Sequence, residues 1–262
     1  LVTKENVSSY VDDLYGKTFD DSAYTKKLPV LLYHHISGNV ENDMIVSPEK
    51  FEADMKAISD SGYAAITLDN VIDYIEKGVE LPENPVMITF DDGYMSNFQY
   101  AYPILEKYGL KGVIFAVGET YGRETYPGTD KPIYPHFSDS ERDEMNESGV
   151  IEVECHTYGL HQSPLYGGVY DNILIKNGEN EWEYVKRLKN DIKKWSDTLG
   201  YEPKALAFPH GISDLLSQSV LNELGIKLTF STVPKTDTLI KGISLSGYAL
   251  GRYTITETTD VI

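Results

Sequence analysis

Two adjacent carboxylates, Asp91 and Asp92, end an apolar run in the segment VMITFDDGYMSNF, which spans Val86 to Phe98. The apolar run is typical of a buried strand, so the two charges would lie side by side at the rim of the core. Like charges this close are costly unless a cation, or a proton in transfer, is there to use them. The pair therefore indicates a bound cation whose other ligands stand elsewhere in the chain.

Two histidines follow a second apolar run, in VIEVECHTYGLHQ. His156 comes directly after the predicted strand and His161 five residues later, a spacing that does not fit one face of a helix. On a turning loop, however, both imidazoles can converge on one point. Each histidine alone would be read as a surface or core residue. Two histidines together with an aspartate after another strand, however, suit a divalent transition metal that keeps positions open for water.

Together, TFDDGY and HTYGLH resemble the polysaccharide deacetylase family, the carbohydrate esterases that share the NodB-like homology domain. The resemblance extends from about residue 29 to the C-terminus. It implies that Asp91 is the general base. It also implies a set of metal ligands made of Asp92, His156 and His161. The spacing of the two histidines is that of the branch acting on poly-N-acetylglucosamine.

The third motif of this family usually reads R-x-P-Y-G, whereas this chain has AFPHG from Ala207 to Gly211. Alanine thus replaces the arginine that normally engages the base, and His210 replaces the aromatic residue. The backbone N–H after the proline does not depend on the side chain, so it could still bind an oxyanion. Arg252 is a candidate substitute for the arginine, with a plain surface or salt-bridging role as the alternative. The residues assigned to oxyanion or substrate binding are Tyr94, Pro209 and His210.

The general-acid histidine of the family lies in a late L-x-L-H motif, but no histidine follows His210 in this chain. Near the other end, PVLLYHHI contains the similar run from Leu31 to His34. This resembles the circularly permuted branch, in which the last barrel strand has moved to the front of the chain. His34 is therefore the predicted acid and His35 the less favoured neighbour. The alternative is that the pair only caps a strand by hydrogen bonding.

Short apolar runs and amphipathic stretches alternate from Leu28 onward. The runs predict strands at Val30–Tyr33, Ala64–Thr67, Val86–Phe90, Gly112–Val117, Val150–Glu154, Ala205–Phe208, Leu228–Ser231 and Tyr248–Thr254. Three helices are clearest: one from Ser47 to a stop at Gly62, one after the capping box Ser138–Glu141, and one over EWEYVKRLKNDIKKWSDTLG. We interpret the apolar stripe of the last helix as core packing. Its members are Trp182, Val185, Leu188, Ile192, Trp195 and Leu199.

Strands separated by helices imply parallel pairing through crossover connections. Seven or eight such units in 262 residues predict an α/β protein with one distorted (β/α) barrel, in which function lies at the carboxyl ends of the strands. Residues 1–27 are polar and are expected to form a linker or arm. Residues 28–262 are then the deacetylase domain.

The composition limits the classes of partner that the protein can bind. The formal net charge of −18 disfavours nucleic acid and anionic membrane surfaces, and no apolar run is long enough to span a bilayer. Cys155 is the only cysteine, which excludes an internal disulfide, and strand alternation makes it a buried structural thiol rather than a ligand. Because the chain begins at Leu1, we expect a mature fragment that acts outside the cell or at its surface. We also expect a monomer.

These observations predict a metal-dependent hydrolase that removes N-acetyl groups from N-acetylglucosamine-containing polysaccharide. The expected cofactor is one divalent ion, Zn²⁺ in the first place and Co²⁺ or Ni²⁺ otherwise. Two alternatives stay open at this point. An acetyl-xylan esterase would use the same site on an O-acetyl ester, and a glycan-binding module with decayed catalysis would explain the absence of the motif arginine.

Overall fold

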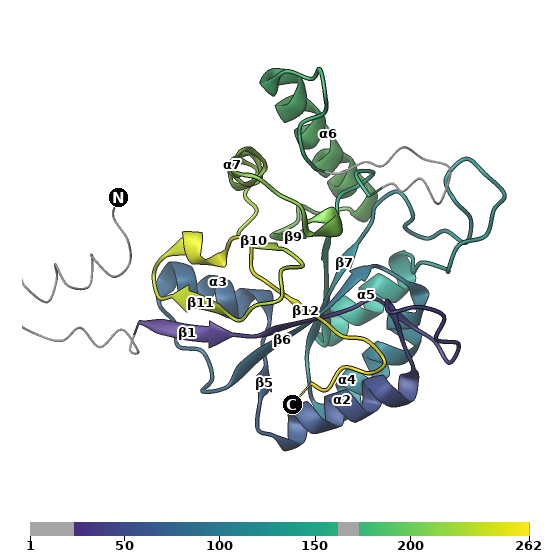
Figure 1. The fold of residues 1–262 in the computed structure, drawn as a ribbon, viewed down its shortest axis with the longest axis vertical. Helices are drawn as coiled ribbons and strands as arrows, with labels where there is room; N and C mark the ends of the chain where they lie inside the picture. The colour runs from purple at the N-terminus through teal and green to yellow at the C-terminus, as the bar shows by residue number, and fades with distance from the viewer. Residues whose placement is uncertain (1–23, 162–172, 262) are drawn as a thin grey trace, which may run out of the picture.

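The computed structural model describes residues 24–161 and 173–261, so most of the predicted arm lies outside the described residues. Seven parallel strands form a curled sheet in the order β10-β9-β8-β7-β6-β2-β12 (Figure 1). They are β2 Val30–Tyr33, β6 Pro85–Asp92, β7 Gly112–Ala116, β8 Ile151–Cys155, β9 Ala205–Ala207, β10 Leu228–Phe230 and β12 Tyr253–Thr254. A further short strand, β5 (Ala64–Ala65), pairs with β6. The expected distorted barrel of parallel strands is confirmed.

The two edges of the sheet are joined by the last segment of the chain. Leu250 forms a parallel bridge with Phe230 of β10, and Tyr253 pairs with Leu31 of β2. β2 therefore lies between β6 and the final strand, although it is the first strand of this sheet in the sequence. This is the neighbourhood that the permutation interpretation predicts.

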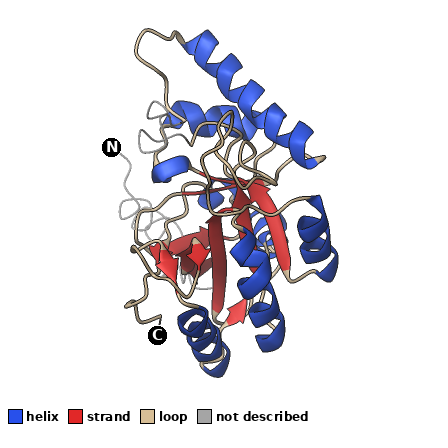
Figure 2. Ribbon diagram, turned by 90° about the vertical axis from the view of Figure 1, so that its right-hand side faces the viewer, coloured by secondary structure: helices blue, strands red, loops and turns tan. Residues whose placement is uncertain are grey.

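Helices surround the sheet on its outer side (Figure 2). They are α2 Pro48–Asp60, α3 Leu68–Lys77, α4 Tyr102–Tyr108, α5 Asp139–Ser148, α6 Glu181–Leu199 and α7 Leu215–Glu223. A π-helical turn, Asn97–Ala101, precedes α4, and 3-10 turns cover Pro209–Gly211 and Ser244–Gly247. None of the described helices is both long and apolar enough to cross a membrane.

The predicted helix starts are confirmed. The Ser47 hydroxyl caps α2 by accepting a hydrogen bond from the backbone N–H of Lys50 at 3.1 Å. At α5, Ser138 and Glu141 form the expected reciprocal capping box. These side chains satisfy backbone donors that the first helical turn leaves without an internal partner.

Two predictions about extent were wrong. The strand predicted over Tyr248–Thr254 is reduced to β12, because Ala249 has a left-handed backbone, with φ of 52°. In α6, Trp182 is 70% exposed, because it lies on the solvent side of the first turn, whereas Tyr184 of the same turn is buried. The buried face of α6 is instead formed by Tyr184, Leu188, Asp191, Ile192, Trp195, Ser196 and Leu199.

Apart from the exposed β12, the sheet strands are buried on both faces, which explains why they read as continuous apolar runs. Val113 and Phe115 of β7 belong to one apolar cluster together with α3, whereas Ile114 and Ala116 belong to a second one with α2, α5 and α6. Two small sheets not predicted from the sequence complete the fold. They pair β1 (Thr25–Leu28) with β11 (Asp237–Ile240), and β3 (His35–Ile36) with β4 (Ile45–Val46).

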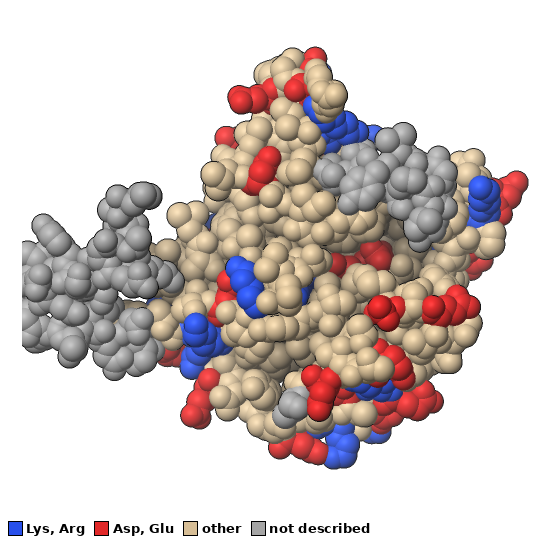
Figure 3. Space-filling view, viewed as in Figure 1, with Lys and Arg blue, Asp and Glu red and all other residues tan. Residues whose placement is uncertain are grey.

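The charged surface is mixed, with an acidic excess. Asp and Glu side chains gather along the lower rim of the face shown in Figure 3, over the region of α2 and α4, and Lys and Arg side chains lie between them. One such ion pair joins Lys107 of α4 to Glu52 of α2. Exposed pairs of this kind contribute little to stability.

One acidic group is buried in the sheet itself. Glu154 of β8 accepts hydrogen bonds through one oxygen, Oε2, from the backbone N–H groups of Lys204 and Ala205, at 3.0 and 3.1 Å. It thereby ties β8 to the start of β9. Burial raises the pKa of Glu154 to about 8, although the two N–H donors and Lys204 oppose this shift.

This raised pKa predicts a pH-dependent stability. From about pH 4.5 to pH 8 the unfolded chain releases the Glu154 proton and the folded chain keeps it, so the free energy of unfolding falls as the pH rises. In Glu154→Gln a single amide oxygen can accept both N–H groups without titrating. We expect parent and variant to be equally stable at pH 4, and the variant to be more stable at pH 8 by about 4 kcal/mol, since one pKa unit corresponds to about 1.4 kcal/mol. Denaturant unfolding across this pH range measures the difference. If the free energies of unfolding of parent and variant change with pH in the same way, the prediction is contradicted.

Candidate metal centre and active site

The turn after β6 explains how adjacent aspartates can serve one site. In a regular strand their side chains would point to opposite faces. Here Asp92 has φ of 74° and Gly93 has φ of 84°, so the chain turns sharply at the strand end. A Cβ on Gly93 would lie 3.0 Å from the Cβ of Ala116, which adds a steric requirement for glycine to the conformational one. The DDG sequence therefore redirects the second carboxylate.

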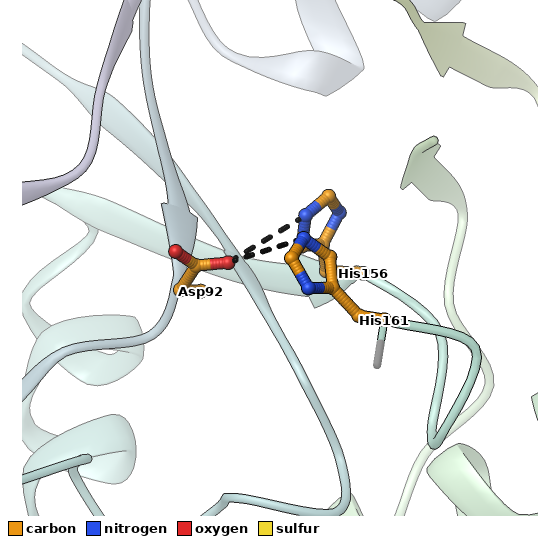
Figure 4. Close-up of side chains that lie close together, drawn as sticks. All are labelled: Asp92, His156 and His161. Carbon is orange, nitrogen blue, oxygen red and sulfur yellow. Dashed lines mark ion pairs between the residues drawn. The ribbon is translucent and has the colours of Figure 1, made fainter. Parts of the chain in front are cut away.

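Asp92, His156 and His161 form a cluster at the carboxyl ends of β6 and β8 (Figure 4). The Oδ1 atom of Asp92 lies 3.7 Å from Nε2 of His156 and 3.7 Å from Nε2 of His161. These separations are too long for hydrogen bonds, and ligands of one tetrahedral ion lie roughly 3.3 Å apart when each is bound at about 2.0–2.1 Å. Within the described residues, this is the one cluster of side chains with such spacing.

The hydrogen bonds around the cluster prepare it for a cation. Nδ1 of His156 lies 2.8 Å from the carbonyl oxygen of Ala207, which can only accept, so the proton is on Nδ1 and the lone pair of Nε2 faces Asp92. Burial lowers the pKa of His156 to about 4, which keeps the ring neutral. Burial would raise the pKa of Asp92, but His161, His34 and His156 hold it well below its ordinary value. Two imidazoles and a carboxylate fit a divalent transition metal.

Asp91 lies beside this cluster and is paired with Arg252. The guanidinium donates from Nη1 to Oδ1 and from Nη2 to Oδ2, both at 2.7 Å, and from Nε to the carbonyl of Ser231 at 2.9 Å. Both side chains are buried. Burial raises the pKa of Asp91, but Arg252 and then His156 bring it below its ordinary value. The lowered pKa keeps the carboxylate ionised. Oδ2 of Asp91 lies 3.8 Å from Nε2 of His156, so this oxygen faces the cluster.

The two histidines after β2 have different surroundings. His34 lines the same cleft as Asp92 and His161, and burial lowers its pKa although both aspartates oppose the shift. His35 has Nδ1 2.8 Å from the hydroxyl of Ser96, and its ring stacks on Tyr134 with centroids 4.3 Å apart. His34 therefore lies among the groups of the metal cluster, and His35 belongs to an aromatic wall.

The AFPHG motif forms a tight turn beside the cluster. His210 has φ of 57°, and its ring lies 4.6 Å from that of His161, centroid to centroid. Gly211 has φ of 70°, and a Cβ there would come within 2.1 Å of the hydroxyl of Thr232. The glycine is thus required by both space and conformation, and it shapes the turn that follows Pro209.

The cluster opens into a cleft of about 1190 Å³. Beyond the histidines, its walls come from the loop after β7, which supplies Tyr126, Tyr134, His136 and Glu119, and from Asp43 and Met44. Tyr94 lies in the wall with its ring 5.0 Å from the rings of both His35 and His136. The sequence indicated Tyr94 but not His136, Tyr134 or Glu119. All three lie in the long segment between the predicted strands Gly112–Val117 and Val150–Glu154, and long loops of this kind are often substrate walls.

The predicted site residues are thus largely brought together. Asp91, Asp92, His156, His161 and His34 converge although they come from three separate strands. Arg252 contacts the carboxylate that the missing motif arginine would engage. Cys155 is buried with its thiol pKa raised by burial, and its sulfur accepts from the N–H of Thr157, as expected for a structural thiol.

Comparison with known proteins gives a consistent picture. A family model described as polysaccharide deacetylase matches residues 78–229. YxkH of Bacillus subtilis (strain 168), named as a candidate polysaccharide deacetylase, is 28% identical over 252 residues, which cover 90% of this chain and 81% of the relative. The poly-beta-1,6-N-acetyl-D-glucosamine N-deacetylase of Staphylococcus aureus is 27% identical over 210 residues, which cover 78% of this chain and 67% of the relative.

Two solved structures share the fold. IcaB from Ammonifex degensii has a TM-score of 0.71 at 24% identity, over 88% of this chain and 92% of that one. A de-N-acetylase from Aggregatibacter actinomycetemcomitans has a TM-score of 0.73 at 22% identity, over 90% of this chain and 97% of that one.

Proposed function

The chain belongs to the polysaccharide deacetylase family, and from this premise we propose that it is a metal-dependent N-deacetylase of a polysaccharide built from N-acetylglucosamine. One observation carries the proposal. A carboxylate held by a buried arginine, Asp91, lies against a cluster that can bind a divalent ion, in a cleft large enough for sugar residues. A binding module has no use for an ionised base at this place.

The ligands of the ion would be Asp92, His156 and His161, and we propose Zn²⁺ as the ion. When bound, it would supply an activated water and polarise the acetyl carbonyl. Asp91 would take the proton of that water at Oδ2, the oxygen nearer the histidines. Arg252 orients both oxygens of Asp91 and keeps the carboxylate ionised in a buried place. Because the guanidinium uses one lone pair on each oxygen, Oδ2 retains acceptor capacity for the proton.

His34 would give a proton to the departing amine, since an amide nitrogen leaves poorly without one. It lines the cleft together with Asp92 and His161, and its backbone carbonyl is fixed by the Asn97 side-chain amide at 2.8 Å. The backbone amide after Pro209 would donate to the developing oxyanion. The products are acetate and a free glucosamine unit.

The substrate class rests on the walls of the cleft and on the relatives. Tyr134 lines the cleft, stacks on His35 and is 41% exposed, so an aromatic ring is available at the cleft wall for contact with a sugar. The Staphylococcus aureus relative is named for poly-beta-1,6-N-acetyl-D-glucosamine. We therefore propose this polymer class, and action outside the cell or at its surface, where such polymers lie.

Acetate release from four acetylated materials tests the proposal. The full chain is loaded with Zn²⁺ and given β-1,6-linked N-acetylglucosamine oligomers, chitooligosaccharides, peptidoglycan and acetylated xylan under the same conditions. We expect the greatest rate on the β-1,6-linked oligomers, loss of this rate after chelation, and recovery on adding Zn²⁺ or Co²⁺. Release from acetylated xylan alone would identify an esterase, and no release from any material would contradict the proposal.

A further inference from the structure

A buried carboxylate on α6 contacts the loop that carries both histidines. Asp191 accepts a hydrogen bond at Oδ1 from the backbone N–H of Tyr158 at 2.8 Å, and one at Oδ2 from the N–H of Gly159 at 2.9 Å. It is 8% exposed and lies between apolar residues of the helix, such as Leu188 and Ile192. A carboxylate in such a place is costly unless it is fully hydrogen-bonded.

The loop that Asp191 holds has an unfavourable backbone. Thr157, directly after His156, has φ of 65°, which is a rare conformation for a β-branched residue. Its hydroxyl is buried without a hydrogen-bond partner among the described residues. Strained conformations of this kind persist only where surrounding contacts over-determine them, and they concentrate at functional sites.

The contacts that hold the loop come from two sides. On the β7 side, the N–H groups of Gly118 and Glu119 donate to the carbonyls of Thr157 and Tyr158, at 3.0 and 2.8 Å. On the α6 side, Asp191 accepts hydrogen bonds from the backbone N–H groups of Tyr158 and Gly159. The loop is therefore held from two sides, at the strained residue and directly after it.

Helix α6 is itself fixed to the carboxyl end of β7. The indole N–H of Trp195, one turn after Asp191, donates to the carbonyl of Ala116 at 2.8 Å. The backbone N–H of His156 donates to that carbonyl too, at 3.0 Å. Asp191 thus projects from a helix whose position is set by the backbone that also places His156.

We propose that Asp191 is a positioning residue that holds the 156–161 loop so that His156 and His161 converge on Asp92. The two N–H groups bind the ionised carboxylate, which has an acceptor oxygen for each of them. Burial raises the pKa of Asp191 to about 6 while these N–H groups lower it, so the ionised form is retained at neutral pH. A purely structural role, tying α6 to the barrel, is the alternative that the experiment must separate.

Asp191→Asn tests this assignment with little change in volume. An amide has one acceptor oxygen, and its NH₂ group would oppose the second backbone N–H. The measurements are the dissociation constant of Co²⁺ by chelator competition, the visible absorption spectrum of the Co²⁺-loaded protein, and the unfolding of the metal-free protein. We expect the dissociation constant to rise about 10- to 100-fold, with an altered spectrum, in a protein that still folds.

Ser196→Ala is the matched control. Ser196 is also buried on α6, but its hydroxyl bonds to Glu202 and to the carbonyl of Ile192 rather than to the loop. The control should lose stability without a change in Co²⁺ affinity or spectrum. If Asp191→Asn does not fold, Asp191→Glu, which keeps both oxygens on a longer side chain, is measured in its place. Unchanged Co²⁺ binding, or failure of both variants to fold, would overturn the proposal in favour of a structural role.

This inference rests on the metal centre of the proposed function, but the two can fail separately. If the parent protein does not bind Co²⁺, the proposed function itself is contradicted. If the parent binds Co²⁺ and the Asp191 variant binds it equally well, only the role of Asp191 is contradicted. Neither result depends on a substrate.

Discussion

Asp91→Asn is expected to reduce deacetylation by about 10³-fold while the protein still binds its metal. The asparagine keeps the size of the side chain but cannot accept a proton from water. Asp91 is not a member of the Asp92–His156–His161 cluster, so metal content should be unchanged. Metal analysis of the purified variant, together with acetate release, measures both quantities on one sample.

Asp92→Asn is the companion change and should show the opposite pattern. Its carboxylate lies 3.7 Å from both imidazoles, so its loss removes one of three ligands and the metal affinity should fall with the activity. Equal loss of metal in both variants would show that the two roles are misassigned.

A folding defect must be separated from the loss of the base. Asp91→Asn leaves the Arg252 guanidinium buried without its counter-charge, and breaking such a pair costs about 3–5 kcal/mol. The double variant Asp91→Asn with Arg252→Gln removes that charge. It should regain part of the stability and none of the activity, as followed by denaturant unfolding. Activity that returns with stability would contradict the assignment of Asp91 as the base.

Much of the site could be predicted because strand ends are easy to recognise. Asp91, Asp92 and His156 each follow an apolar run, and parallel strands of a barrel bring their carboxyl ends to one rim. The resemblance added which residue would act as base and which as ligand. The resemblance to the permuted branch also placed His34 at this rim, and β2 is a parallel strand of the sheet beside β6.

Other features depend on contacts between distant segments, which no local pattern contains. Arg252 reaches Asp91 because the last segment crosses from β10 to β2 and turns the guanidinium inward. From the sequence, a surface role for that arginine was equally reasonable. Asp191 is a stronger case, since an acidic residue on an amphipathic helix is normally exposed. Its burial becomes intelligible only when the N–H groups of the histidine loop are seen beside it.

The extents of elements were predicted less well than their existence. The run Tyr248–Thr254 is apolar and β-favouring, but the left-handed Ala249 and a preceding 3-10 turn leave only two residues in the sheet. Trp182 is spaced like a member of the apolar stripe of α6, and yet it is exposed, because Tyr184 takes the buried position in the first turn. Periodicity reports which face could be buried, whereas neighbouring elements decide where burial begins.

His34→Ala is expected to separate amide from activated-ester hydrolysis. An amine leaves only when it is protonated, so loss of the acid should reduce release of acetate from N-acetylglucosamine oligomers by about 10² to 10⁴. An aryl acetate has a good leaving group that needs no proton, and its hydrolysis should be largely retained. The ratio of the two rates, measured on one metal-loaded preparation, isolates the role of the acid from any general damage to the site.

His35→Ala is the matched control for this prediction. His35 is the next residue in the chain, but its ring stacks on Tyr134 and its Nδ1 bonds to Ser96, so its loss should alter the cleft wall and not the proton supply. We expect the ratio of amide to ester hydrolysis to stay near that of the parent. If His34→Ala deacetylates the oligomers at the parent rate, the acid lies elsewhere. His210, whose ring lies 4.6 Å from that of His161, would then be the next residue to replace.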